Sequence, residues 1–185
     1  MIQLDTSWLQ HVQKPARYTG GEYNSIVKDH STVDVTMALG FPDVYEVAMS
    51  HLGIKILYGL VNRREDAVAE RVFAPWHDME EEMRKRNIPL FSLETRTPIK
   101  DFDVLAFTLQ YEMSFTNILN MLDLAGIPMY AKERDLDFPL LVCGGPCAYN
   151  VEPIADFFDI VSLGESEEWG DEFIDLFKAE KANWF

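Results

Sequence analysis

The sequence is short of cysteine, of basic residues and of long apolar runs, and each shortage excludes a class of protein. Two cysteines in 185 residues do not make a disulfide framework. The chain has 16 basic and 31 acidic residues, which give a formal net charge of -15. This charge disfavours direct binding to the phosphates of nucleic acids. No apolar run reaches membrane-spanning length, and residues 1–5 lack the features of a signal peptide. We therefore expect a cytoplasmic protein without membrane contact.

Phosphate-binding loops and metal-ligand pairs are also missing. Neither Gly-x-x-x-x-Gly-Lys-Ser/Thr nor Gly-x-Gly-x-x-Gly occurs. The four histidines are scattered, and none pairs at metal-ligand spacing with a cysteine or another histidine. For His51, on the first long predicted helix, a structural or surface role is the preferred interpretation. We predict no metal site and no catalytic residue in this chain.

The sequence does contain apolar runs that alternate with helical patterns. The runs predict core strands at Val33–Phe41, Ala69–Ala74, Val104–Leu109, Leu140–Cys143 and Ile160–Leu163, with an edge strand at Pro89–Glu94. Helices are expected near Trp8, from Asp43 to Asn62, from His77 to Asn87, from Ser114 to Ala125 and from Glu167 to Lys178. Strands that are apolar on both faces are typical of a parallel sheet covered by helices.

This pattern predicts an α/β fold with a doubly wound, mainly parallel sheet in three layers and a flavodoxin-like strand order. Residues 1–32, broken by Pro15, Gly20 and Gly21, are expected to form an N-terminal arm. Residues 33–185 are expected to form the domain itself.

Ligands of an open parallel sheet bind beyond the carboxyl ends of its strands, so the residues at those ends are the candidate site. They are Pro42, Asp43, Tyr45, Gln110, Tyr111, Glu112, Gly144, Gly145, Pro146, Gly164 and Glu165. Two glycines after a buried strand let the backbone approach a flat ligand, although the same pair also suits a plain tight turn.

The spacing Cys143-x-x-x-Cys147 matches the first half of the radical S-adenosylmethionine (SAM) cluster motif Cys-x-x-x-Cys-x-x-Cys. Asn150 stands at the third position, and an iron–sulfur cluster normally takes three or four thiolates. We therefore predict that this chain alone neither holds a cluster nor cleaves SAM.

Asp43-x-Tyr45-x-x-Ala48 resembles the Asp-x-His-x-x-Gly signature of classical cobalamin-binding domains, whose histidine is the lower axial ligand of cobalt. Tyr45 stands in the histidine position here. Thr108-Leu109-Gln110 lies near the place of a second signature, Ser-x-Leu, and Gly144-Gly145 matches the third. Any cobalamin bound here would lack a protein histidine on the metal.

Blocks along residues 14–178 resemble the N-terminal region of an uncharacterised radical SAM family with a cobalamin-binding-like domain. The blocks are Arg17–Asn24, Phe41–Gly53, Ala69–Trp76, Pro89–Glu94, Gln110–Glu112, Gly144–Cys147 and Gly164–Glu167. Cobalamin-dependent radical methylases commonly read Gly-Glu-Gly-Glu at the last block, where this chain has Ser166.

The resemblance implies a cleft between this domain and a radical SAM barrel that the chain lacks, with any corrinoid between them. The 4Fe-4S cluster and SAM would belong to that missing barrel. Two alternatives stay open: a scaffold that docks the barrel without a cofactor, and an independent flavin-binding module, which the acid-rich last helix disfavours. The acidic run Glu152–Glu180 predicts a solvated helix face or a docking surface.

Overall fold

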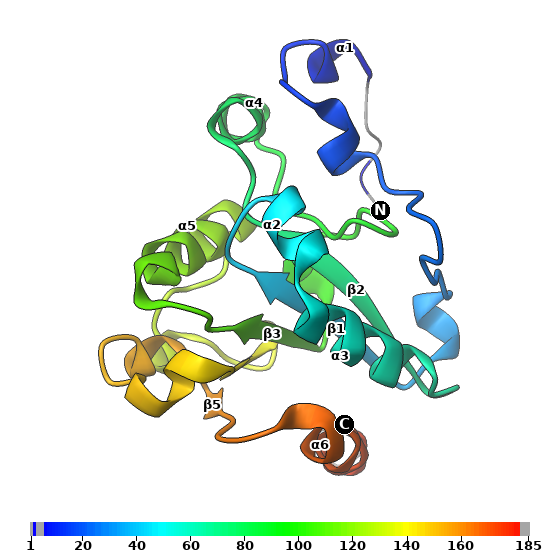
Figure 1. Cartoon of the computed structure of the whole chain (residues 1–185), viewed down its shortest axis with the longest axis vertical. Coiled ribbons are helices and arrows are strands. Elements are labelled where there is room, and N and C mark those ends of the chain that lie inside the picture. Colours follow the sequence, from blue (N-terminus) through cyan, green and yellow to red (C-terminus); the bar gives the residue numbers. More distant parts are fainter. Residues whose placement is uncertain (1, 3–5, 182–185) are drawn as a thin grey trace.

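The computed structural model describes residue 2 and residues 6–181 and contains a five-stranded, all-parallel sheet (Figure 1). Its strands are β1 (Val35–Phe41), β2 (Ala67–Phe73), β3 (Val104–Thr108), β4 (Leu140–Gly144) and β5 (Ile160–Val161). Their spatial order, β2-β1-β3-β4-β5, is the flavodoxin-like order. This confirms the predicted fold class, and the five core strands differ from prediction only at their ends.

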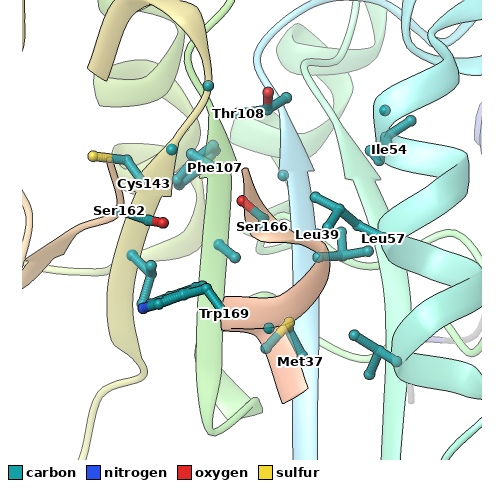
Figure 2. A pocket seen from close by; sticks show the side chains of 18 of the residues that line it. Met37, Leu39, Ile54, Leu57, Phe107, Thr108, Cys143, Ser162, Ser166 and Trp169 are labelled. Carbon is teal, nitrogen blue, oxygen red and sulfur yellow. The ribbon is translucent and has the colours of Figure 1, made fainter. Parts of the chain in front are cut away.

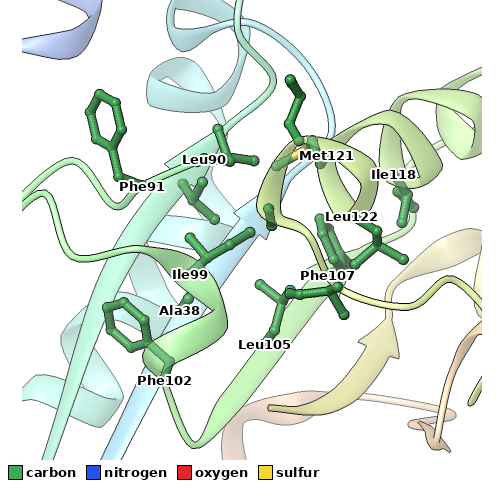
Figure 3. Close-up of a cluster of buried hydrophobic side chains, with 14 of the residues drawn as sticks. Ala38, Leu90, Phe91, Ile99, Phe102, Leu105, Phe107, Ile118, Met121 and Leu122 are labelled. Carbon is green, nitrogen blue, oxygen red and sulfur yellow. The ribbon is translucent and has the colours of Figure 1, made fainter. Parts of the chain in front are cut away.

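Helices cover both faces of the sheet and so give three layers (Figure 1). The main helices are α2 (Tyr45–Ser50), α3 (Leu52–Asn62), α4 (His77–Arg86), α5 (Phe115–Ala125) and α6 (Ser166–Lys181). Side chains of α3 and α6 pack on one face with Val35, Met37 and Leu39 of β1. Figure 3 shows the core of the opposite face, where Ile118, Met121 and Leu122 of α5 meet Leu105 and Phe107 of β3.

Two predicted elements differ from the structure. The helix expected from Asp43 to Asn62 is two helices, because His51 has the extended values φ −77° and ψ 125°. The edge strand expected at Pro89–Glu94 does not form, and an isolated antiparallel bridge joins Phe91 to Pro98 instead. The chain turns back there through Arg96 at φ 57°. The Leu93 amide and the side chains of Ser92 and Glu94 bind β2 without forming a further strand.

Buried charges on β2 explain this arrangement. The Glu70 side chain is fully buried and accepts hydrogen bonds from Ser92 and Thr95, while His30 lies 2.7 Å from it. Arg71 forms an equally buried salt bridge of 2.6 Å with Glu94, whose pKa is raised by burial. These charges are compatible with the interior only because they are paired. The segments before β1 and after α4 therefore cover the edge that β2 would otherwise expose.

The predicted N-terminal arm packs closely against the domain. Trp8 of α1 (Thr6–Leu9) is buried within the core that also contains α4 and α5. Lys28 donates to the backbone oxygens of Asn62, Arg64 and Ala67. The predicted ranges 1–32 and 33–185 extend at their outer ends into residues that the structure does not describe. These are residues 1, 3–5 and 182–185.

Part of the acidic run in α6 is used within the molecule. Arg64, after α3, contacts Asp171 and Asp175 of α6 as well as Asp66 at the start of β2. Lys178 of α6 pairs with Asp34 and Asp66 at 2.5 and 3.1 Å. These pairs join α6 to the amino ends of β1 and β2. In the described part of the chain, no helix has the length and apolarity needed to cross a membrane.

Candidate functional site

An apolar cavity of about 220 Å³ lies between the sheet and the helices α3 and α6 (Figure 2). Met37 and Leu39 of β1, Ile54 and Leu57 of α3, and Trp169 of α6 line its length. The Trp169 ring stacks on Phe173 with the ring centroids 4.8 Å apart. The cavity reaches the carboxyl end of the strands, where Thr108, Gln110, Gly144 and Gly145 line it. Its interior suits an uncharged, flat group.

The Gly-Gly turn forms one wall of the cavity mouth. Gly145 has φ 104°, and an added Cβ there would lie 3.0 Å from the Leu109 oxygen. The amide of Leu109 donates to Gly144, and the amide of Cys147 donates to Leu109, so the two strand ends are held together. Gly144 has more room, since an added Cβ would make an ordinary contact of 3.5 Å with Ser162. Glycine at 145 is therefore needed for the turn, whereas glycine at 144 keeps the mouth open.

Hydroxyl groups surround this turn. Ser162, after β5, and Ser166, at the start of α6, line the cavity near Gly144, and Thr108 lies at the end of β3 (Figure 2). The Gln110 amide donates to the Thr108 hydroxyl, which orients the Gln110 oxygen away from Thr108. Three hydroxyls and an amide can therefore hydrogen-bond the polar margin of a ligand whose body fills the apolar interior.

His51 also lines this cavity, and sequence analysis did not place it there. Its Nε2 lies 3.0 Å from the Gln110 oxygen, and its ring packs against Phe41 with the centroids 5.2 Å apart. Its Nδ1 is shielded from solvent and has no hydrogen-bond partner among the described residues. Gly53 packs against this ring, because an added Cβ there would lie 3.0 Å from Cε1 of His51. No sequence motif reveals that pairing without the fold.

The structure brings four of the eleven predicted site residues to the cavity, namely Gln110, Gly144, Gly145 and Gly164. Asp43 and Tyr111 lie next to one another at the same edge, with the tyrosine hydroxyl donating to Asp43 at 3.2 Å. The negative charge of Asp43 raises the pKa of Tyr111. The Pro42 oxygen accepts a hydrogen bond from Asn117 of α5.

The remaining predicted residues do not line the cavity. Tyr45 packs edge-on against Phe73 at 5.8 Å and lines a much smaller pocket beside Arg17 and Arg71. Burial, followed by the charge of Glu22, raises the pKa of Tyr45. Glu112, Pro146 and Glu165 lie on the exposed segments after β3, β4 and β5.

The two cysteines differ in exposure. Cys143 of β4 is buried, and burial raises the pKa of its thiol to about 12. Cys147 is half-buried, and burial with the nearby Glu112 carboxylate raises its thiol pKa as well. Within residues 6–181, no three histidine, cysteine, aspartate or glutamate side chains lie close enough to hold a metal ion.

Comparison with known proteins identifies the family. The family model for the N-terminal region of radical SAM proteins matches residues 53–184, which include α3, every strand from β2 to β5 and α6. The chain belongs to this family. An uncharacterized protein of Methanocaldococcus jannaschii is 27% identical over 134 residues, which are 71% of this chain and 24% of that protein. The chain thus spans about a quarter of the length of the relative it matches.

Proposed function

We propose that this radical SAM N-terminal domain supplies the corrinoid-binding face of a radical SAM protein. The observation that carries the proposal is the cavity of about 220 Å³ that opens at the Gly144-Gly145 turn. An apolar cavity at the carboxyl edge of a parallel sheet is the usual place for a cofactor in this type of fold. Cobalamin, when bound, would supply a cobalt centre for methyl or other group transfer.

The residues at the cavity mouth suit the edge of such a group, and the cavity of about 220 Å³ has room for only part of it. Gly144 and Gly145 form a cradle that side chains would fill, and His51 Nδ1 is a polar atom that lacks a partner among the described residues. The aromatic Trp169 and the aliphatic Leu39, both lining the cavity, can pack against the flat faces of a ring. The hydroxyls of Ser162 and Ser166 lie where a polar ring margin would meet them.

Cobalt in this site would lack a histidine at the position used by classical cobalamin-binding domains. Tyr45 occupies that position in the sequence, and its ring lies against Phe73 beside the smaller pocket rather than in the cavity. A neutral tyrosine is also a poor metal ligand compared with imidazole. We infer that Tyr45 would not serve as a cobalt ligand in this site.

The proposed partner of this face is the radical SAM barrel of the longer protein. Met113, Tyr149 and Leu163, which are 83%, 76% and 64% exposed, follow the carboxyl ends of β3, β4 and β5. Exposed large apolar side chains at one edge of a sheet are typical of an interaction surface. The barrel would cover the ligand from the open side and would bring the 4Fe-4S cluster and SAM to it.

The scaffold alternative uses the same edge without a cofactor, and these exposed side chains favour it as much as they favour the first proposal. Titration with hydroxocobalamin, followed by desalting and visible absorption, separates the two. Retention of the corrinoid by the barrel-containing protein supports the first proposal. If the barrel-containing protein is active yet retains no corrinoid, the scaffold function is correct.

A further inference from the structure

The break between α2 and α3 fixes His51 at the end of the cavity that lies near the carboxyl ends of the strands. Its extended backbone ends one helix and begins the next, while its amide donates to Ala48. The ring packs on Phe41, and Nε2 lies 3.0 Å from the Gln110 oxygen. The imidazole therefore has one defined position against the cavity.

The orientation of Gln110 in the structure favours one imidazole tautomer of His51. The Gln110 amide nitrogen donates to the Thr108 hydroxyl, so its oxygen is the group that faces His51. An oxygen accepts, which means that Nε2 of His51 donates and that Nδ1 holds a lone pair in the neutral ring. Nδ1 is consequently a hydrogen-bond acceptor that is shielded from solvent and unpaired within the described chain.

Gly53 lies next to this acceptor. An added Cβ at position 53 would lie 3.3 Å from Nδ1 and 3.0 Å from Cε1, and Gly53 itself lines the cavity. Any side chain at 53 would press on the imidazole, so glycine allows His51 to keep this position at the cavity wall. A shielded acceptor without a partner is unfavourable, so a ligand that donates to it gains the hydrogen bond that folding left unmade.

We propose that His51 Nδ1 accepts a hydrogen bond from an N–H group of the ligand and so anchors it in the cavity. This inference rests on the proposed corrinoid function, and it assigns the donor to one of the carboxamide side chains that surround a corrin ring. His51 is a binding residue in this account and does not ligate cobalt. In this proposal the contacts from Thr108 through Gln110 to His51 hold the imidazole with Nδ1 as the acceptor.

The test compares the hydroxocobalamin affinity of the wild type and three variants by equilibrium titration. His51→Phe keeps a flat ring and removes the acceptor, and we expect it to weaken binding about tenfold. His51→Asn places an amide oxygen near the Nδ1 position and should restore most of the affinity. His77→Phe, at an exposed histidine outside the cavity, should bind like the wild type. Circular dichroism and melting temperature establish that each variant is folded.

Each outcome separates this inference from the proposed function. Wild-type binding that is unchanged in His51→Phe overturns the anchor alone and leaves the corrinoid function standing. Failure of the wild type to bind overturns both. Electron paramagnetic resonance of bound cob(II)alamin gives a second readout: nitrogen splitting that disappears in His51→Phe would show cobalt ligation and overturn the hydrogen-bond anchor.

Discussion

Gly145 lies so close to the Leu109 backbone that a Cβ at this position would be 3.0 Å from the Leu109 oxygen. Because Gly145 also has φ 104°, we expect Gly145→Ala to lower the free energy of unfolding by about 1–3 kcal/mol. Gly144→Ala is the matched control, since its Cβ would make only ordinary contacts. Urea denaturation of both variants measures the difference. Equal stability of the two variants would contradict the close approach of Gly145 to the Leu109 oxygen.

Gly20 should be the point at which the N-terminal arm is most sensitive to substitution. A Cβ at Gly20 would clash with the Leu93 oxygen, whereas a Cβ at Gly21 would meet nothing within 4 Å. Both glycines have positive φ, so Gly21→Ala isolates the backbone strain and Gly20→Ala adds the clash. We expect faster hydrogen exchange across residues 15–30 in Gly20→Ala than in Gly21→Ala. Similar exchange in both would show that the arm does not depend on this contact.

The order and type of the core elements could be predicted because each strand is a continuous apolar run between helical patterns. The break at His51 could not be predicted, since Ala48, Met49 and Ser50 show no helix-breaking signal. The segment Pro89–Glu94 is a short, largely apolar run like a strand, but its Glu94 pairs with Arg71 of β2, which lies 23 residues away in the sequence. The conformation of this segment therefore depends on buried charge pairs that form only in the folded protein.

The site was predictable where the backbone itself forms it, as at Gly144 and Gly145. The rest depends on side chains from α3 and α6 that converge only in the folded molecule. Ile54 and Trp169 lie more than a hundred residues apart and line the same cavity. Nothing local in the sequence distinguishes such residues from ordinary core positions. Tyr45 illustrates the opposite case, because its motif position predicts the site while its ring packs elsewhere.

Asp66 should give the protein an acid-sensitive component of stability. Hydrogen bonds from Arg64, together with Lys178, lower the pKa of the Asp66 carboxyl to about 2 in the folded state. A folded-state pKa below the unfolded value stabilises the protein above about pH 4, and this stability is lost as the pH falls towards about 2. We expect Asp66→Asn to lower the free energy of unfolding at pH 7 by about 1 kcal/mol, because the carboxylate is partly exposed and screened.

Denaturant unfolding at several pH values tests this. The difference between wild type and Asp66→Asn should shrink as the pH falls from 4 to 2. Glu152→Gln, at an exposed position, is the control and should change little at any pH. A difference for Asp66→Asn that stays constant down to pH 2 would show that the carboxylate charge is not the cause.

The two cysteines should react with alkylating agents at different rates. Cys143 is buried with a thiol pKa of about 12, so almost none of it is the reactive thiolate at pH 8. We expect iodoacetamide to label the half-buried Cys147 first in the native protein, and both cysteines at similar rates in urea. Mass spectrometry of Cys147→Ser should then show almost no native labelling. Rapid labelling of Cys143 in that variant would contradict its burial.

Iron and sulfide provide a separate test of the cysteine pair. Asn150 stands where a third cysteine would complete the cluster spacing after Cys143 and Cys147. Anaerobic reconstitution of the 185-residue chain should therefore leave it colourless and unable to cleave SAM. Stoichiometric iron accompanied by SAM turnover in this chain would overturn the prediction.

The most direct test of corrinoid binding is hydroxocobalamin titration of this chain and of a longer chain that carries the barrel, each with glycine, alanine or leucine at position 144. We predict weak binding by the 185-residue chain and tighter binding by the longer one, because one-sided burial loses contact area. Gly144→Leu should weaken binding at least about tenfold in the longer chain by narrowing the cavity mouth, while Gly144→Ala weakens it much less. Absence of corrinoid binding by both chains, or binding that Gly144→Leu leaves unchanged, would contradict the account.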